Sequence, residues 1–119
     1  MLNLNSILVF SENPKKLVEF YKKVLQMKPG WEGGEFVGFK VGDGYLTIGP
    51  HDKIHGKSKN PERIIFNFET KNVKTEFERI KKLGAKVIAT PYHPGEDKSM
   101  TLATLADPDG NYFQLNTPM

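Results

Sequence analysis

The sequence of 119 residues contains no cysteine, which excludes disulfide bonds and thiol nucleophiles. A chain without cysteine fits a reducing compartment, so we expect a cytoplasmic location. No apolar run approaches the roughly 20 residues that a membrane-spanning helix needs, which predicts no membrane partner. Residues 1–5 have neither the basic nor the apolar region of a secretory signal. We therefore expect a soluble, intracellular protein.

Arginine is also scarce: of 17 basic residues only Arg63 and Arg79 are arginine, although the net charge is +3. Proteins that read nucleic-acid sequence depend on the bidentate hydrogen bonds of arginine. The lysines are spread along the chain, and most share a predicted helix face with glutamate. We interpret them as a solvated surface and predict no nucleic-acid partner.

The first half has the pattern of a strand, a helix and three strands. An apolar run predicts a strand over 2–10, and Asn13 and Pro14 then suit the N-cap and first position of a helix. Apolar residues at helical spacing continue this helix until Pro29-Gly30 ends it. Three short strands separated by glycine turns follow, over 31–32, 35–41 and 45–49.

The second half repeats this order. A strand over 63–69 precedes a helix that Asn72 caps and Gly84 ends, with Leu83 on its apolar face. An offset of 59 residues places Asn13 on Asn72 and aligns the apolar faces of the two helices. Such a repeat predicts an α+β fold made of two βαβββ modules in one domain, 1–119. The modules cover about 1–50 and 62–119, the linker 51–61, and the remaining strands 86–90, 100–106 and 112–116.

Strand alternation sorts the side chains onto two faces of each predicted sheet. One set is wholly apolar and is predicted to pack against the helices: Ile7, Val9, Leu46, Ile48, Phe66, Phe68, Phe113 and Leu115. The other set mixes neutral polar groups with apolar ones, as small-molecule pockets do. A solvent-exposed face is the alternative. We predict a ligand-binding cup lined by Ser6, Leu8, Trp31, Tyr45, Thr47, Ile65, Asn67, Met100, Tyr112 and Gln114.

Two segments carry a resemblance to a known family: the helix ending Glu19-Phe20-Tyr21-Lys22-Lys23-Val24-Leu25, and the stretch from Asp107-Pro108-Asp109-Gly110-Asn111 to Leu115. With the repeat order, they make the chain similar over its whole length to the vicinal oxygen chelate superfamily. This superfamily includes glyoxalase I, bleomycin- and fosfomycin-resistance proteins and extradiol dioxygenases. The resemblance implies a homodimer and, in the metal-using members, four metal ligands on the first and last strands of each module.

The four corresponding positions in this chain are poor in metal-binding groups. By the resemblance they are Ser6, Thr47, Ile65 and Gln114, and only Gln114 is a usual ligand type. A divalent first-row metal needs three or four N, O or S donors. The sequence therefore predicts a cup without metal or other cofactor.

The histidines offer other sites, each set against a plainer interpretation. His51 and His55 have a spacing that binds zinc on a helix, but their glycine- and proline-rich surroundings disfavour a helix. His93 lies in a polar loop, 91–98, with Glu96 and Asp97 nearby, and that trio suits acid–base chemistry or an adventitious ion. We favour a solvated loop there.

Three functions stay open at this point. The first is a protein that sequesters a small organic molecule, with polar groups orienting the ligand, aromatic residues stacking on it and loop 91–98 closing over it. The second is a lyase or isomerase of glyoxalase I type, with a displaced metal site or metal-free catalysis by His93, Glu96 or Tyr92. The third is a structural or regulatory partner with a vestigial cup.

Overall fold

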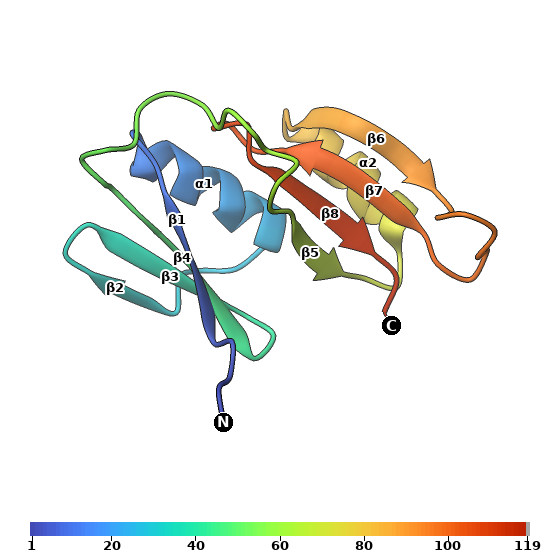
Figure 1. The fold of residues 1–119 in the computed structure, drawn as a ribbon, viewed down its shortest axis with the longest axis horizontal. Helices are drawn as coiled ribbons and strands as arrows, with labels where there is room; N and C mark the ends of the chain where they lie inside the picture. Colours follow the sequence, from blue (N-terminus) through green and yellow to red (C-terminus); the bar gives the residue numbers. More distant parts are fainter. Residues whose placement is uncertain (119) are drawn as a thin grey trace. The chain divides into compact units, whose positions relative to one another are not determined.

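The computed structural model describes residues 1–118 and divides into two compact units, Met1–Gly56 and the chain from Lys57 onward (Figure 1). The division falls inside the segment predicted as the linker. Each unit contains a strand, a helix and three strands, in that order. The elements are β1 (Ser6–Phe10), α1 (Pro14–Leu25), β2 (Trp31–Gly33), β3 (Phe36–Val41), β4 (Gly44–Gly49), β5 (Phe66–Glu69), α2 (Val73–Lys82), β6 (Lys86–Tyr92), β7 (Leu102–Ala106) and β8 (Tyr112–Asn116).

The sheet of the first unit, called sheet A here, has the strand order β1-β4-β3-β2. β1 runs parallel to β4, and the other neighbours are antiparallel. The crossover from β1 to its parallel neighbour includes α1, which packs on one face of the sheet. This arrangement leaves the opposite face of sheet A without a helix from its own unit.

Local chemistry explains where α1 begins and ends. The Asn13 side chain accepts a hydrogen bond from the Lys16 backbone N–H, and Pro14 follows at the first helical position. The helix ends at Leu25, because Gln26 adopts the left-handed conformation (φ 53°), with its N–H bonded to the Lys22 carbonyl. The helix thus ends at Leu25, the last residue of the helical segment that carries the family resemblance, and Pro29-Gly30 lies beyond it.

The sheet of the second unit, called sheet B here, repeats this topology with the order β5-β8-β7-β6. β5 is parallel to β8, and the β7 pairings are antiparallel. Asn72 has almost the same backbone conformation as Asn13 but makes no side-chain capping bond. Gly84 lies just beyond the helix at φ +99°, which confirms the left-handed cap predicted there.

The helix-facing side chains largely form the predicted core. Val9, Leu46, Ile48, Phe113 and Leu115 are buried, as is the apolar side of both helices. The end strands deviate: Ile7 is 39% exposed, while Phe66 and Phe68 are half-buried. Leu83 was predicted on the apolar face of its helix and is 40% exposed, because the helix ends one residue before it.

Several predicted strand limits were wrong, because the partner strand or a competing turn decides them. β1 begins at Ser6 rather than at residue 2, since its partner β4 begins in the turn before Tyr45. β5 begins at Phe66 rather than at residue 63, because the Arg63 N–H bonds back to the Asn60 carbonyl in a turn. This leaves Ile65 just outside the strand.

Two further limits changed in the second unit. β7 begins at Leu102, so Met100 precedes it, and the Thr101 N–H donates to the Thr117 hydroxyl. β6 extends to Tyr92, beyond the predicted end at residue 90, with two shifts in its pairing to β7. As an edge strand, β6 can contain Pro91, whose missing N–H needs no partner there.

Candidate functional site

The open face of sheet A is built from three rows of side chains that run across its strands. The middle row joins Leu8, Thr47, Gly38 and Trp31, one residue from each strand. The row on one side contains Ser6, Tyr45 and Lys40, and the row on the other side contains Phe10, Gly49, Phe36 and Gly33. The residues predicted on this face from unit 1 therefore share it in the structure.

Two glycines let aromatic rings lie against this sheet. A Cβ on Gly38 would lie 2.1 Å from Trp31 Nε1, so the indole occupies the space above that glycine. In the same way, a Cβ on Gly49 would lie 2.4 Å from two Phe36 ring carbons. The indole remains 42% exposed, and Leu8, in the same row, is 57% exposed. This face thus presents apolar surface to solvent on a sheet whose other face is packed in the core.

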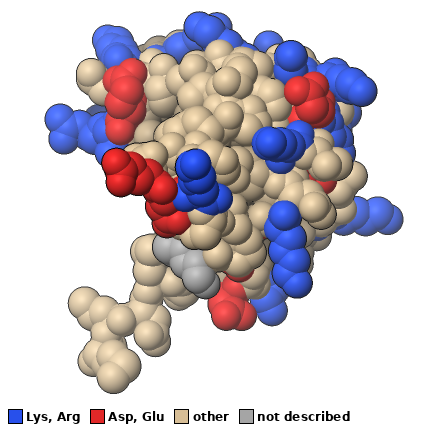
Figure 2. Space-filling view, turned by 90° about the vertical axis from the view of Figure 1, so that its right-hand side faces the viewer, with Lys and Arg blue, Asp and Glu red and all other residues tan. Residues whose placement is uncertain are grey.

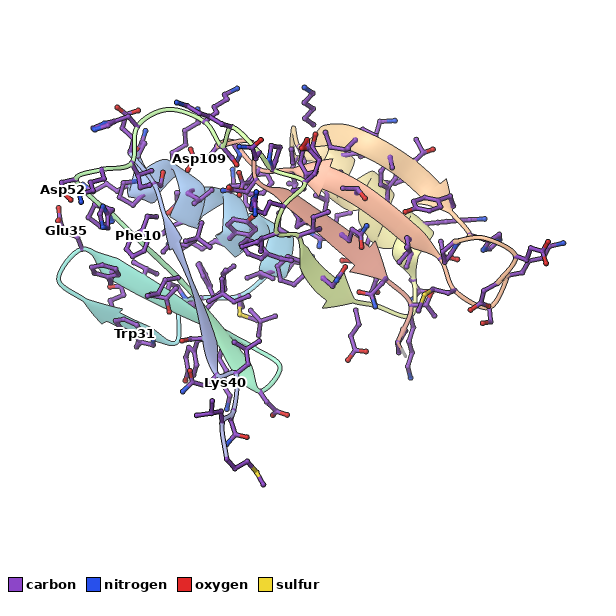
Figure 3. The ribbon with its side chains drawn as sticks, in the orientation of Figure 1. Phe10, Trp31, Glu35, Lys40, Asp52 and Asp109 are labelled. Atoms are coloured by element: carbon purple, nitrogen blue, oxygen red, sulfur yellow. The ribbon has the colours of Figure 1, made fainter. Side chains whose placement is uncertain are left out.

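An aromatic cluster continues from Phe36 toward the segment after β4. The Phe10 and Phe36 rings meet edge to face at 6.2 Å between centroids, and His51 packs against Phe10 at 5.0 Å. The His51 Nδ1 accepts the Lys53 N–H at 3.1 Å, and Gly56 N–H donates to the Glu12 carboxylate. Figure 3 shows Phe10 and Trp31 on different strands of sheet A.

The open face of sheet B is more polar. One row contains Asn67, Gln114, Thr104 and Ala89, and the Gln114 amide donates to the Thr104 hydroxyl at 3.4 Å. The next row contains Glu69, Asn116, Leu102 and Tyr92. Asn116 is 7% exposed, and its Oδ1 is buried with no hydrogen-bond partner among the described residues. Tyr112 lies on this face at the start of β8, whereas Ile65 and Met100 lie outside the strands.

Sequence reasoning missed several members of these faces, among them Phe10, Phe36 and Lys40 on sheet A and Thr104 on sheet B. Phe10 follows Ser6 and Leu8 in simple alternation, so the pattern was available for it. Phe36 and Lys40 required the alternation of the third strand, which had not been assigned to a face. Asn116, on sheet B, follows Tyr112 and Gln114 in the same alternation but was not selected for the site.

The four positions implied for metal ligands do not form a suitable donor set. The Ser6 hydroxyl donates to Asn5 at 3.2 Å, Ile65 has no donor atom, and the Gln114 amide is bonded within sheet B. Among residues 1–118, no group of three or more His, Cys, Asp or Glu side chains is placed to hold a metal ion. These residues therefore do not fit the divalent metals that such positions bind elsewhere.

Each of the three histidines lies close to an acidic or carbonyl oxygen. His55 lies 3.8 Å from the Glu12 carboxylate, and His51 lies 3.2 Å from Asp52. His93 Nδ1 is 2.9 Å from the Met100 carbonyl. Hydrogen bonds from the Ser99 hydroxyl and N–H, with a smaller effect of His93, lower the pKa of Asp97.

The turn Asp107–Asn111 has a structural role. The buried Asp107 carboxylate accepts the N–H groups of Asp109 and Asn111 and the Asn111 side-chain amide, all within 3.0 Å. The Ser58 N–H donates to the Asp109 carbonyl, which ties the start of this unit to the turn. This stretch carries much of the family resemblance, and it holds the turn from which β8 begins.

A sequence model of one family matches residues 3–115, nearly the whole chain, and its description is Glyoxalase/Bleomycin resistance protein/Dioxygenase superfamily. The chain belongs to this superfamily. The match agrees with the repeat and with the two βαβββ units, and it confirms the resemblance and the α+β fold predicted from the sequence. No curated protein matches the chain.

Solved structures of superfamily members share this fold. A glyoxalase-related enzyme from Fulvimarina pelagi has a TM-score of 0.80 at 14% identity, over 99% of this chain and 89% of its own. A family enzyme from Burkholderia phytofirmans PsJN has a TM-score of 0.79 at 20% identity, over 99% and 100%. The fosfomycin resistance protein FosX from Listeria monocytogenes has a TM-score of 0.67 at 19% identity, over 100% and 93%.

The surface charges and the lengths of the helices are relevant to nucleic-acid and membrane partners, neither of which the sequence predicts. In the face that Figure 2 presents, lysine and arginine side chains are dispersed, with acidic side chains among them. No helix within the described part of the chain is long and apolar enough to span a membrane.

Proposed function

We propose that this superfamily member binds a small organic molecule on the open faces of its sheets, without a metal ion. The observation that carries the proposal is the exposed apolar surface of Trp31 and Leu8 on a sheet whose other face is firmly packed. Exposed large apolar side chains that gather on one face of a folded sheet commonly mark a binding site. The poor donor set at the four implied ligand positions supports binding rather than metal-assisted chemistry.

A ligand on these faces needs polar contacts in addition to apolar ones if it is to bind tightly. Covering about 200 Å² of apolar surface on this face is worth about 5 kcal/mol. That gain alone corresponds to a dissociation constant in the range of about 0.1–1 mM, before the entropy cost of binding. Micromolar binding therefore requires polar contacts, which Thr47 and Tyr45 offer on sheet A, and Asn67, Gln114 and Asn116 offer on sheet B.

The test begins with the full-length protein purified without added ligand. Native mass spectrometry should detect a co-purifying small molecule, and neutral or anionic compounds from a metabolite and antibiotic panel should raise the melting temperature. The Leu8→Gln variant should lose this rise. Leu83→Gln, which changes an exposed leucine at the end of α2, should retain it.

Other outcomes would contradict the proposal. If no compound in the panel changes the melting temperature and nothing co-purifies, small-molecule binding is wrong. If the protein converts the methylglyoxal–glutathione hemithioacetal and a chelator stops the reaction, the chain is a metal-dependent lyase of glyoxalase I type.

We also propose a cytoplasmic homodimer. Within the described residues, β1, β2, β5 and β6 are sheet edges that have a strand on one side only. An unpaired edge is a natural place for a second copy to add. Light scattering during size-exclusion chromatography should give twice the 13.5 kDa chain mass, and a mass of one chain would contradict the dimer.

A further inference from the structure

We infer that the open face of sheet A binds a planar aromatic anion, with its ring stacked near Trp31 and its acidic group beside Lys40. This inference rests on the proposed function and specifies the ligand class for one of the two faces. It depends on the shape of the face, on the position of the one charged strand residue there, and on the charges at the opposite end.

The face suits a flat, apolar ring. The indole of Trp31 covers Gly38 instead of standing away from the sheet, so it adds a flat surface beside Thr47 and Leu8. The Phe36 ring covers Gly49 in the same manner. Aromatic ligands gain from stacking on such rings beyond the simple burial of area.

Lys40 places a positive charge on this face. Within the strands of sheet A, Lys40 is the one charged side chain on the open face, since the three rows otherwise hold neutral residues. Lys40 is exposed. It lies on β3 two residues after Gly38, the partner of Trp31, so its row and the row of Trp31 are about 7 Å apart along β3. A Cβ on Gly30 would lie 3.5 Å from the Tyr45 ring and 3.8 Å from the Lys40 Cβ, so these three residues adjoin one another.

The charged residues at the two ends of this face favour one orientation of the ligand. Glu35 and Asp52 lie near Phe10 and away from Lys40, as Figure 3 shows. An anionic group is therefore attracted to the Lys40 end, whereas the Phe10 end carries Glu35 and Asp52 together with Lys53, which follows Asp52 in the chain. Asp43, in the turn between β3 and β4, is the acidic residue nearest to Lys40 in the chain and weakens this attraction.

The experiment uses the single tryptophan as a reporter. Because Trp31 is the only tryptophan, the full-length protein labelled with ¹⁵N gives one indole N–H signal. The probes are naphthalene-2-carboxylate and its neutral analogue naphthalene-2-carboxamide. We expect both to shift the indole signal saturably, and the carboxylate to bind about two- to fivefold more tightly, as an exposed ion pair allows.

Matched variants test the assignment to Lys40. Lys40→Gln should bring the affinity ratio of the two probes to about one, and Asp43→Asn should increase the ratio. Lys15→Gln, which removes an exposed lysine from α1, should leave it unchanged. Raising sodium chloride from about 50 to 500 mM should weaken the carboxylate in the wild type but not in Lys40→Gln.

Each remaining outcome overturns the inference. Equal affinities in the wild type, or a preference that survives in Lys40→Gln, would remove the role of charge while leaving the proposed function intact. Shifts of the Asn67 and Gln114 amide signals without the indole would place the probe on sheet B. An indole signal that moves with protein concentration alone would show that a second copy covers the face. If neither probe shifts any signal, the aromatic anion is wrong, and the compound panel decides the proposed function independently.

Discussion

At the scale of single residues, Gly38 controls where the only tryptophan lies. A methyl group at this position would collide with the indole, since the Cβ would lie within 2.7 Å of three of its atoms. Trp31 is on an edge strand and half exposed, so we expect the ring to swing away and the sheet to remain intact. Gly38→Ala should shift the tryptophan emission to the red and cost about 1 kcal/mol in unfolding free energy, the lower end of the range for an added methyl group.

A double-mutant cycle provides the control for this prediction. In a Trp31→Leu background, Gly38→Ala should be nearly neutral in urea unfolding, since no indole opposes the methyl group. An equal cost in both backgrounds would show that the sheet itself, and not the tryptophan, requires glycine at this position.

The Asp97 carboxylate is a second residue whose chemistry depends on one neighbour. The Ser99 hydroxyl and N–H hold its pKa below the ordinary value of about 3.9, with a smaller effect of His93. A depressed pKa stabilises the folded loop above pH 3.9, and this contribution is lost as the pH falls through the lower, folded pKa. Ser99→Ala should raise the pKa of Asp97 in a ¹³C NMR titration. An unchanged pKa would assign the shift to the other groups.

At the scale of elements, the two helices provide a matched test of capping, because the repeat places Asn13 and Asn72 in equivalent positions. Only Asn13 makes a side-chain hydrogen bond to its helix. Asn13→Ala should therefore cost about 1 kcal/mol in urea unfolding, whereas Asn72→Ala should cost only a few tenths. Equal losses would show that the backbone conformation, rather than the hydrogen bond, determines the effect.

The entry to β8 depends on the buried Asp107 carboxylate. Its three hydrogen bonds hold the turn from which β8 starts. Asp107→Ala leaves those three partly buried donors without their acceptor and should cost about 2–4 kcal/mol. Asp107→Asn keeps one acceptor oxygen and should lose less, and circular dichroism during heating would distinguish the two variants. If both variants melt like the wild type, the turn does not depend on this carboxylate.

The sequence was most informative where structure is local. The helix start at Asn13-Pro14, the glycine after α2 and the alternation of β4 and β8 all depend on near neighbours in the chain, and they were predicted correctly. Strand ends were not, because the limits of β1 depend on where β4 begins, more than thirty residues later. The sequence also did not predict that the Trp31 indole lies over Gly38, because this contact depends on the register between β2 and β3.

At the scale of the whole molecule, the superfamily fold and the residues on its sheets lead to different expectations about metal. The fold is shared with enzymes and resistance proteins, but a fold alone does not assign chemistry. In this chain, Ile65 and the hydroxyls of Ser6 and Thr47 stand at three of the four positions implied for metal ligands. Hydroxyls and alkyl groups do not hold a first-row divalent metal against water. The residues at these positions therefore support the proposal of an organic ligand and no metal.

This view predicts that the stability of the molecule does not depend on metal. Removing metals with EDTA should leave the melting temperature unchanged, and adding zinc, nickel or manganese should not raise it. A specific site filled at about 100 times its dissociation constant would add about 2.7 kcal/mol, which raises the melting temperature of a chain this size by several degrees. A variant with His51, His55 and His93 changed to Gln is the control, because it removes the exposed imidazoles. A rise that persists in this variant would show that groups other than these imidazoles bind the metal, which would contradict the prediction that stability does not depend on metal.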